Sequence, residues 1–128
     1  MKKNQNLIQF AQKARENAYA PYSNFSVGAA LLLDNEEVVL GVNVENSSLG
    51  GTVCAERSAV FTAVTKGSRK FKAIAVVTDS SPPAAPCGFC RQVLAEFAPD
   101  LPIILGNTQG EIIETNLNIL LPMQFKLA

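Results

Sequence analysis

The chain has 128 residues, of which 48% are hydrophobic and 17% charged, and its formal net charge is +0. This length suits one domain, residues 1–128, with a buried core, and the balanced charge excludes the basic footprint typical of a nucleic-acid-binding protein. The longest apolar run, residues 27–33, is far short of the roughly 18 residues that a membrane helix needs, so we expect no membrane association.

Hydrophobic periodicity and turn residues divide the chain into alternating helices and strands. Apolar residues recur at steps of three and four before Pro21, which indicates an amphipathic helix, and short apolar or alternating runs bounded by turn residues indicate strands. The elements expected in chain order are a helix over 4–19, strands over 26–33 and 37–44, a helix from about Cys54, a strand over 73–78, a helix over about 88–97, and strands over 101–105 and 111–115. Cys54 should then lie in the first turn of the second helix.

The last two expected strands are separated by only five residues, 106–110. A parallel crossover needs a dozen or more residues, so these two strands should run antiparallel. Strands that alternate with helices, with a hairpin at each end, predict an α/β fold in which helices cover a mixed sheet.

The chain has three cysteines, Cys54, Cys87 and Cys90, and no histidine. An odd number of cysteines argues against a disulfide framework and fits a reducing, cytoplasmic location. Free cysteines are often buried apolar fillers, but Glu56 next to the first and Pro86 before the second favour a metal site. Structural zinc almost always has four protein ligands, whereas catalytic zinc keeps one position open. Three thiolates therefore indicate a catalytic zinc site.

Two motifs, Cys54-Ala55-Glu56 and Pro86-Cys87-Gly88-Phe89-Cys90, resemble the signature of the zinc-dependent nucleoside deaminases, and among them the small cytidine deaminases. The resemblance extends to 20–30, 43–46 and 120–122, and so covers nearly the whole chain. It implies a three-layer α/β/α fold with a mixed five-stranded sheet. Antiparallel final strands are typical of the branch that acts on free nucleosides, whereas the polynucleotide editors insert a helix there.

The resemblance also implies a reaction. Cytidine and deoxycytidine would be deaminated with water to uridine and deoxyuridine, with release of ammonia, as in pyrimidine salvage. One Zn²⁺ per subunit would make hydroxide available for attack on C4 of the pyrimidine, and Glu56 would shuttle protons. Relatives of this length are homotetramers whose sites are shared between subunits.

Three thiolates give a zinc site a net negative charge, which weakens the metal as a Lewis acid. The positive ends of the helices that begin near Cys54 and Cys87 offset this charge, and Arg57 is a second source of compensation. By position alone, Arg57 could equally be a surface arginine paired with any nearby carboxylate. The resemblance to three-cysteine deaminases favours its contact with the thiolates.

Further residues are expected to bind the nucleoside. Asn43 and Glu45 share one face of a strand and could bond a sugar hydroxyl, although a polar pair at a strand end is usually part of a turn. The resemblance assigns them to the ribose, the Ala55 backbone to the base edge, and Phe25 to the pocket wall. Phe125 would stack on the base in a neighbouring subunit, although phenylalanines more often serve core or surface packing.

Two residues depart from the family pattern. Leu49 stands where the family often has tyrosine, and Phe89 where it usually has a small residue.

Two other functions are possible. A deaminase acting on blasticidin S would share the cysteine motifs, but those relatives lack the motif kept here as Asn43, Glu45 and Asn46. A structural zinc module would need a fourth protein ligand, such as Asp79 or Glu56.

Overall fold

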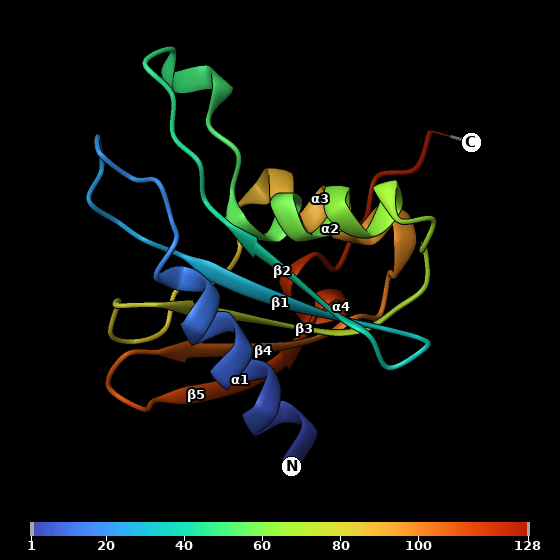
Figure 1. Ribbon diagram of the computed structural model, residues 1–128. Helices are drawn as coiled ribbons and strands as arrows, with labels where there is room; N and C mark the ends of the chain where they lie inside the picture. The colour runs from blue at the N-terminus through green and yellow to red at the C-terminus, as the bar shows by residue number, and fades with distance from the viewer. Residues whose placement is uncertain (1, 128) are drawn as a thin grey trace.

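Five strands form one mixed sheet in the order β2-β1-β3-β4-β5 (Figure 1). The computed structural model describes residues 2–127, with side chains described from residue 6 onward. The strands are β1 (Gly28–Leu33), β2 (Val38–Val42), β3 (Phe71–Thr78), β4 (Pro102–Asn107) and β5 (Ile112–Asn116). β3 and β4 are parallel, and the other neighbouring pairs are antiparallel. The expected mixed sheet with antiparallel final strands is therefore confirmed.

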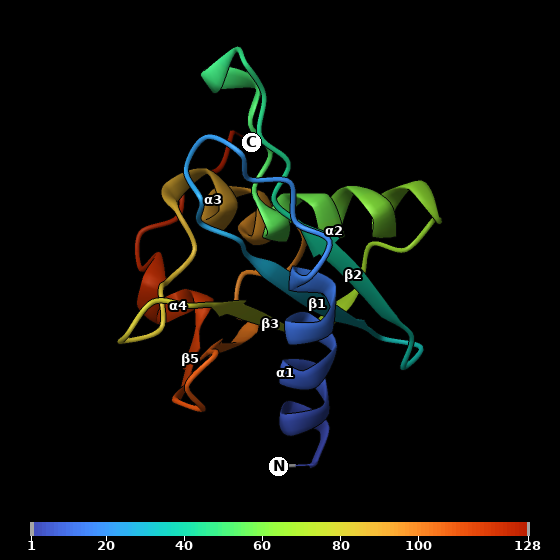
Figure 2. The same cartoon turned by 60° about the vertical axis from the view of Figure 1, so that its left-hand side comes forward.

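Helices cover both faces of the sheet and make three layers (Figures 1 and 2). α1 (Lys2–Arg15) packs on one face, and α2 (Ala55–Thr65) and α3 (Gly88–Phe97) pack on the other. Side chains of a strand alternate between the faces, so Ala30 and Leu32 of β1 join the core under α1, while Leu31 joins the core under α2 and α3. The expected three-layer α/β/α fold is confirmed.

Two glycines let a helix approach the sheet closely. A Cβ added to Gly28 would lie 2.0 Å from the Ala11 carbonyl oxygen and 2.7 Å from the Arg15 nitrogen of α1. A Cβ at Gly41 would lie 2.3 Å from the Ala55 carbonyl oxygen at the start of α2. Since no larger residue fits at either position, these glycines set where the end of α1 and the first turn of α2 lie.

The first helix ends four residues earlier than expected, at Arg15 instead of Tyr19. Residues 16–18 make only turn hydrogen bonds, and the Tyr19 N–H donates to the Asn43 carbonyl at 2.9 Å. Tyr19 also forms a parallel bridge with Val44. The backbone groups that would have extended the helix are used in a contact distant in sequence, which helical periodicity cannot reveal.

Other boundaries also differ from the expectation. β1 begins at Gly28 instead of residue 26, because the Val27 N–H donates to the Asn43 side chain and not to a neighbouring strand. Cys54 caps α2 with an extended backbone and is not part of its first turn. β2 ends at Val42, because Val44 leaves the ladder to form an isolated bridge with Val53.

Two short helices were not expected. The 3₁₀ helix η1 (Leu49–Gly51) lies in an arm that projects from the body in both views (Figures 1 and 2). α4 (Leu117–Leu120) follows β5 directly, where the Asn116 side chain accepts a hydrogen bond from the Ile119 N–H at 3.0 Å. Asparagine is a favoured N-cap, so that signal was present in the sequence.

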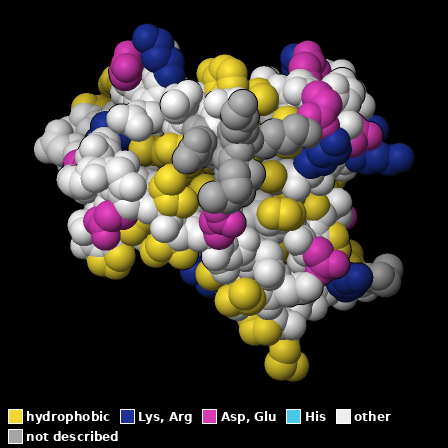
Figure 3. Space-filling view, turned by 90° about the horizontal axis from the view of Figure 1, so that it is seen from below, with side chains coloured by type: hydrophobic (Ala, Val, Ile, Leu, Met, Phe, Trp, Pro, Cys, Tyr) yellow, Lys and Arg dark blue, Asp and Glu magenta, His cyan; other side chains and the backbone are white. Residues whose placement is uncertain are grey.

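The surface mixes charges of both signs. On the face seen from below, Lys and Arg side chains lie beside Asp and Glu side chains (Figure 3). Lys66 pairs with Glu37 at 3.1 Å, and Lys72 pairs with Glu36. Within residues 2–127, no helix has the length and apolar character required to cross a bilayer.

Candidate functional site

Three thiols meet where two helices begin. Cys54 caps α2, Cys87 caps α3, and Cys90 is buried in the first turn of α3. The sulfur of Cys87 lies 3.8 Å from that of Cys54 and 3.4 Å from that of Cys90, and all three sulfurs lie within 4.8 Å of one another. Both helix N-termini direct positive dipole ends at the thiols, which favours the thiolate form.

The donor set fits a zinc ion. A tetrahedral site with zinc–sulfur distances of about 2.3 Å places its sulfurs roughly 3.8 Å apart, close to the separations found here. Among the residues that the structure describes, the cluster of candidate metal ligands contains these three cysteines and no fourth member. Asp79, one of the possible fourth ligands, instead pairs with Arg15 at 3.6 Å. A three-sulfur site suits a catalytic zinc better than a closed structural one.

The thiols are already strongly polarised. Hydrogen bonds from Cys90, and then from Arg57 and Cys87, lower the pKa of the Cys54 thiol to about 5 against the opposing effect of burial. The same hydrogen bond with Cys54, together with burial, raises the pKa of Cys90. The cluster therefore favours the thiolate form of Cys54 and disfavours that of Cys90.

Arg57 contacts the cluster as the sequence analysis expected. Its Nη2 donates to the Cys54 sulfur at 3.5 Å and to the Thr52 carbonyl at 3.3 Å. The Phe89 ring lies on the other side, with its centroid 5.7 Å from the Arg57 Cζ. A cation within about 6 Å of an aromatic face is attracted to it. Phe89, which departs from the family pattern, thus helps to hold the guanidinium beside the thiolate.

Glu56 lies two residues after Cys54 and is buried, with 5% of its surface exposed. Burial is the main reason that the pKa of its carboxyl is raised to about 7, and the negative charge of Cys54 adds to the effect. A carboxyl group with a pKa near neutrality can both accept and release a proton.

Glu56 lines a cavity of about 220 Å³. This volume is on the scale of a small metabolite, below the roughly 300–1,000 Å³ of drug-sized pockets. Predicted site residues that line it are Phe25, Asn43, Glu45, Cys54, Ala55, Glu56 and Cys87. The other lining residues, which the sequence analysis did not single out, are Ser23, Val27, Thr52, Val76, Thr78, Ala84 and Ala85.

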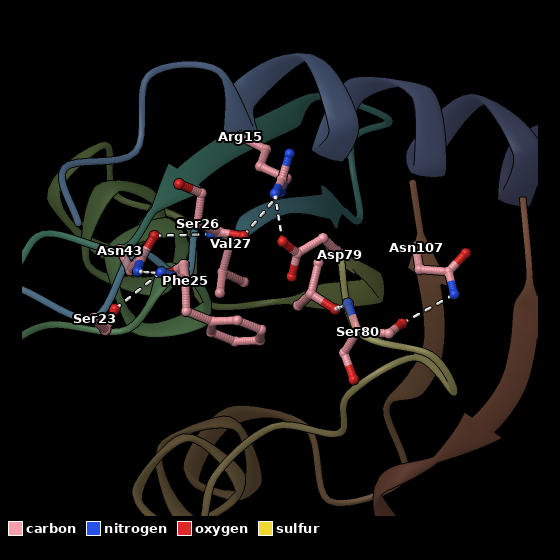
Figure 4. Close-up of polar contacts among 10 residues, drawn as sticks. Arg15, Ser23, Phe25, Ser26, Val27, Asn43, Asp79, Ser80 and Asn107 are labelled. Atoms are coloured by element: carbon pink, nitrogen blue, oxygen red, sulfur yellow. Dashed lines mark hydrogen bonds and ion pairs between the residues drawn. The ribbon is translucent and has the colours of Figure 1, made fainter. Parts of the chain in front are cut away.

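Asn43 and Glu45 are both buried and both hold backbone of the segment before β1. Figure 4 shows Asn43, whose Nδ2 donates to the Phe25 carbonyl at 2.7 Å and whose Oδ1 accepts from the Val27 N–H at 2.9 Å. Glu45 Oε1 accepts from the Tyr22 N–H at 2.9 Å and from the Ser23 N–H at 3.0 Å. Asn43 and Glu45 therefore line the cavity and also hold the backbone of a segment that forms part of its wall.

Comparisons with known proteins agree with this geometry. Residues 1–105 match the family described as the cytidine and deoxycytidylate deaminase zinc-binding region. A cytidine deaminase from Halalkalibacterium halodurans is 53% identical over 94% of this chain and 92% of its own length, and one from Sporosarcina psychrophila is 52% identical over 93% and 88%. The crystal structure of cytidine deaminase from Burkholderia pseudomallei superposes with a TM-score of 0.92 at 51% identity, over 94% of this chain and 98% of that one.

The chain belongs to the cytidine and deoxycytidylate deaminase family.

The region matched to this deaminase family contains the whole cavity and all three cysteines, but not Phe125. Phe125 lies in the tail after α4, 67% exposed, and its carbonyl accepts from Gln92 Nε2 at 3.2 Å. It does not line the cavity of its own chain. The structure of one chain therefore leaves the predicted contact of Phe125 with the base as a prediction.

Ser23 is a cavity residue of this deaminase that the sequence analysis did not single out. Its hydroxyl donates to Glu45 Oε2 and accepts from the Phe25 N–H at 3.1 Å. The hydrogen bond from Ser23 is the main cause that lowers the pKa of Glu45, which keeps that carboxylate ionised. Ser23 lies in the helix-breaking run 20–24, and that position is the only feature of the sequence that points to it. Its partner, Glu45, lies 22 residues away.

Proposed function

We propose that this chain is a cytidine deaminase, which converts cytidine or deoxycytidine and water to the uracil nucleoside and ammonia. The observation that supports it most is one cavity that unites a buried acid, Glu56, with the thiol cluster and with two polar side chains, Asn43 and Glu45. The two curated relatives named above are themselves cytidine deaminases.

In this proposal Cys54, Cys87 and Cys90 hold one zinc ion per subunit. When bound, zinc supplies the Lewis acidity that makes hydroxide available near neutral pH. Arg57 offsets part of the thiolate charge through its hydrogen bond to Cys54. This compensation matters because excess negative charge at the site would disfavour the formation of hydroxide.

Glu56 is the proposed proton carrier. It accepts the proton that the attacking water releases and delivers it to ring N3. It then takes the remaining proton from the hydroxyl group added at C4 and passes it to the departing amine. The C4–O bond forms and the C4–N bond breaks, so water and cytidine become uridine and ammonia. The raised pKa of Glu56, about 7, supports both directions of transfer.

The sugar and the base have separate proposed partners. The Glu45 carboxylate, whose pKa is lowered mainly by Ser23, can accept a hydrogen bond from a ribose hydroxyl. Asn43 retains one amide hydrogen and one oxygen lone pair beyond its two bonds to backbone. Phe25 forms the apolar wall, and the backbone of Ala55 lies at the cavity where it can bond the base edge.

We also propose that residues 1–128 form a single deaminase domain that assembles as a cytoplasmic homotetramer. Leu49 and Phe89 are 70% and 77% exposed in one chain, and assembly would bury such large apolar side chains. Phe125 would then reach the base in a neighbouring subunit. Three cysteines free of disulfides suit a reducing compartment, and the mixed surface charge supports a free nucleoside over a polynucleotide as substrate.

The experiment is to measure zinc per purified chain and to follow ultraviolet absorbance with cytidine, deoxycytidine and blasticidin S. We expect one zinc per chain and turnover of both nucleosides but not of the antibiotic. Zinc without nucleoside turnover would contradict the proposal and support a structural module. Turnover of blasticidin S alone would indicate an antibiotic deaminase.

A further inference from the structure

Two segments that are distant in sequence line the cavity from different elements. One is the run before β1, which carries Ser23, Phe25 and Val27. The other is the loop over residues 79–86, which carries Ala84 and Ala85 and ends at Cys87. Both segments therefore form part of the cavity wall.

Arg15, the last residue of α1, contacts both segments (Figure 4). Its Nε donates to the Ser26 carbonyl at 2.8 Å, and its Nη2 lies 3.6 Å from Asp79 Oδ2. The Arg15 side chain is only 23% exposed. A guanidinium presents several donors in a rigid plane, so one arginine can hold two acceptors at a fixed separation.

The position of Arg15 is itself fixed by packing. A Cβ at Gly28 would lie 2.7 Å from the Arg15 nitrogen and 2.9 Å from its Cα, so the end of α1 rests directly on the start of β1. The guanidinium therefore extends from a backbone position that cannot shift toward or away from the sheet without loss of core contacts.

On the first side, Arg15 contacts Ser26, which lies between two residues that line the cavity. Ser26 lies between Phe25 and Val27, and the Asn43 amide bonds the Phe25 carbonyl at 2.7 Å and the Val27 N–H at 2.9 Å. Arg15 and Asn43 thus both hold the peptide group between Ser26 and Val27, and Asn43 also holds the preceding one (Figure 4). The place of the Phe25 ring in the cavity depends on both.

On the second side, the base of the loop is anchored. The Ser80 N–H donates to Thr78 Oγ1 at 3.1 Å, and the Ser80 carbonyl accepts from Asn107 Nδ2 at 2.9 Å. Asn107 is buried and also accepts from the Glu111 N–H at 2.9 Å. Because Ser80 is held on β3 and β4, the ion pair of Asp79 with Arg15 relates α1 to a fixed part of the loop.

We propose that Arg15 and Asp79 are positioning residues that set the separation between the Phe25 run and the 79–86 loop, and through it the affinity for the nucleoside. Neither residue lines the cavity, so they act through Ser26 and the loop backbone and take no part in proton transfer. This inference rests on the proposed function of the cavity as a nucleoside site.

The test is a comparison of KM and kcat for cytidine in Arg15→Ala, Arg15→Lys and Asp79→Asn, with zinc content and urea unfolding measured on each. Arg15→Ala should raise KM about tenfold, the effect of losing a charge-assisted hydrogen bond. Asp79→Asn should raise it about two- to fivefold, since the ion pair is partly exposed. In each variant kcat should stay within about twofold, because the Glu56 chemistry is untouched.

The conservative variant and a matched control sharpen the result. Arg15→Lys can keep the pair with Asp79 but lacks the planar fork that also holds the Ser26 carbonyl, so its KM should lie between those of the wild type and Arg15→Ala. Arg69→Ala removes the same charge from the exposed loop after α2 and should leave KM unchanged.

The outcomes separate this inference from the proposed function. A wild-type protein without nucleoside turnover would refute the function. An active wild type with unchanged KM in Asp79→Asn and Arg15→Ala, whether or not their stability falls, would refute the positioning role alone. If Arg15→Ala does not fold, Asp79→Asn and Arg15→Lys decide, because both preserve the packing of α1 on Gly28.

Discussion

At the scale of single residues, the proposed chemistry depends on a carboxyl group that is buried beside a thiolate. Glu56 would be a surface residue of the first turn in most helices, where it favours the helix dipole. Here α2 rests on the sheet so closely that Glu56 is buried, and its pKa is raised to about 7. Burial converts an ordinary helix residue into a group that can exchange protons at neutral pH.

We predict that Glu56→Gln keeps zinc and loses most of its activity. The amide preserves the shape of the side chain but cannot carry a proton, so kcat should fall by about a hundred- to ten-thousandfold. Zinc analysis and ultraviolet turnover of cytidine measure the two effects. The control is Glu96→Gln on the exposed part of α3, which should behave as wild type. Near-normal turnover in Glu56→Gln would reject the proton-carrier role.

A second residue-scale prediction concerns Arg57. Arg57→Ala should retain zinc, because the three sulfurs remain, but should reduce kcat by roughly ten- to a hundredfold, the effect expected for loss of a hydrogen bond to a charged group. This prediction rests on the hydrogen bond of 3.5 Å from Arg57 Nη2 to the Cys54 sulfur. Arg57→Lys should recover part of the rate, since a lysine restores charge without the planar fork. Equal activity in all three proteins would show that the thiolate charge needs no compensation from this residue.

At the scale of elements, the site depends on how α2 and α3 begin. Cys54 and Cys87 each occupy the N-cap position with extended backbone and without a side-chain capping bond, so both sulfurs remain directed at the shared site. α2 can be placed there because β2 has a glycine, Gly41, under its first turn. A backbone feature of one strand therefore positions the catalytic motif of the next helix.

Gly41→Ala should displace the first turn of α2. The new Cβ would lie 2.3 Å from the Ala55 carbonyl oxygen, and backbone cannot yield as a flexible side chain can. Overpacking of this kind lowers the free energy of unfolding by about 1–3 kcal/mol, and zinc per chain should fall with it. Urea unfolding and zinc analysis measure both. Gly50→Ala is the matched control, since a Cβ there has no neighbour within 4 Å. If Gly41→Ala matches this control, the close approach is not what places the helix.

At the scale of the whole molecule, the cavity of one chain lacks one of the residues expected to contact the base. Phe125 lies in the tail, and α3 joins that tail to the cysteine cluster. Arg91 donates to the Pro86 carbonyl at 2.8 Å and to the Leu120 carbonyl at 2.7 Å. The helix that presents Cys87 and Cys90 thus also holds the segment that leads to Phe125. Assembly would complete the site.

A mixing experiment tests this shared site. Phe125→Ala and Glu56→Gln proteins should each be less active alone than the wild type. Phe125→Ala loses base stacking, worth about 1 kcal/mol or fivefold in rate. Glu56→Gln loses the proton carrier. After reversible dissociation and mixing, sites with Glu56 from one chain and Phe125 from another should recover activity. Turnover after mixing and mass by light scattering report the result. A monomer, or an absence of recovery in mixed oligomers, would contradict shared sites.

The sequence alone determined the donor set, the order of the elements and the pairing of the last two strands. These depend on local rules: three cysteines without histidine leave one possible thiol cluster, periodicity separates helix from strand, and a five-residue loop excludes a parallel crossover. The N-cap at Asn116, which begins α4, followed an equally local rule and was missed.

Only the tertiary structure decided which residues support the site. The end of α1 depends on the Tyr19 N–H donating to the Asn43 carbonyl, 24 residues along the chain. The roles of Ser23 and Arg15 depend on Glu45 and Asp79, partners that periodicity and spacing cannot identify. Burial of Glu56, the main cause of its raised pKa, likewise arises only when α2 packs on the sheet. Hydrogen bonds and burial between segments distant in sequence arise only when the chain has packed. For that reason local motifs could predict the candidate metal ligands, but not the residues that hold the site in place.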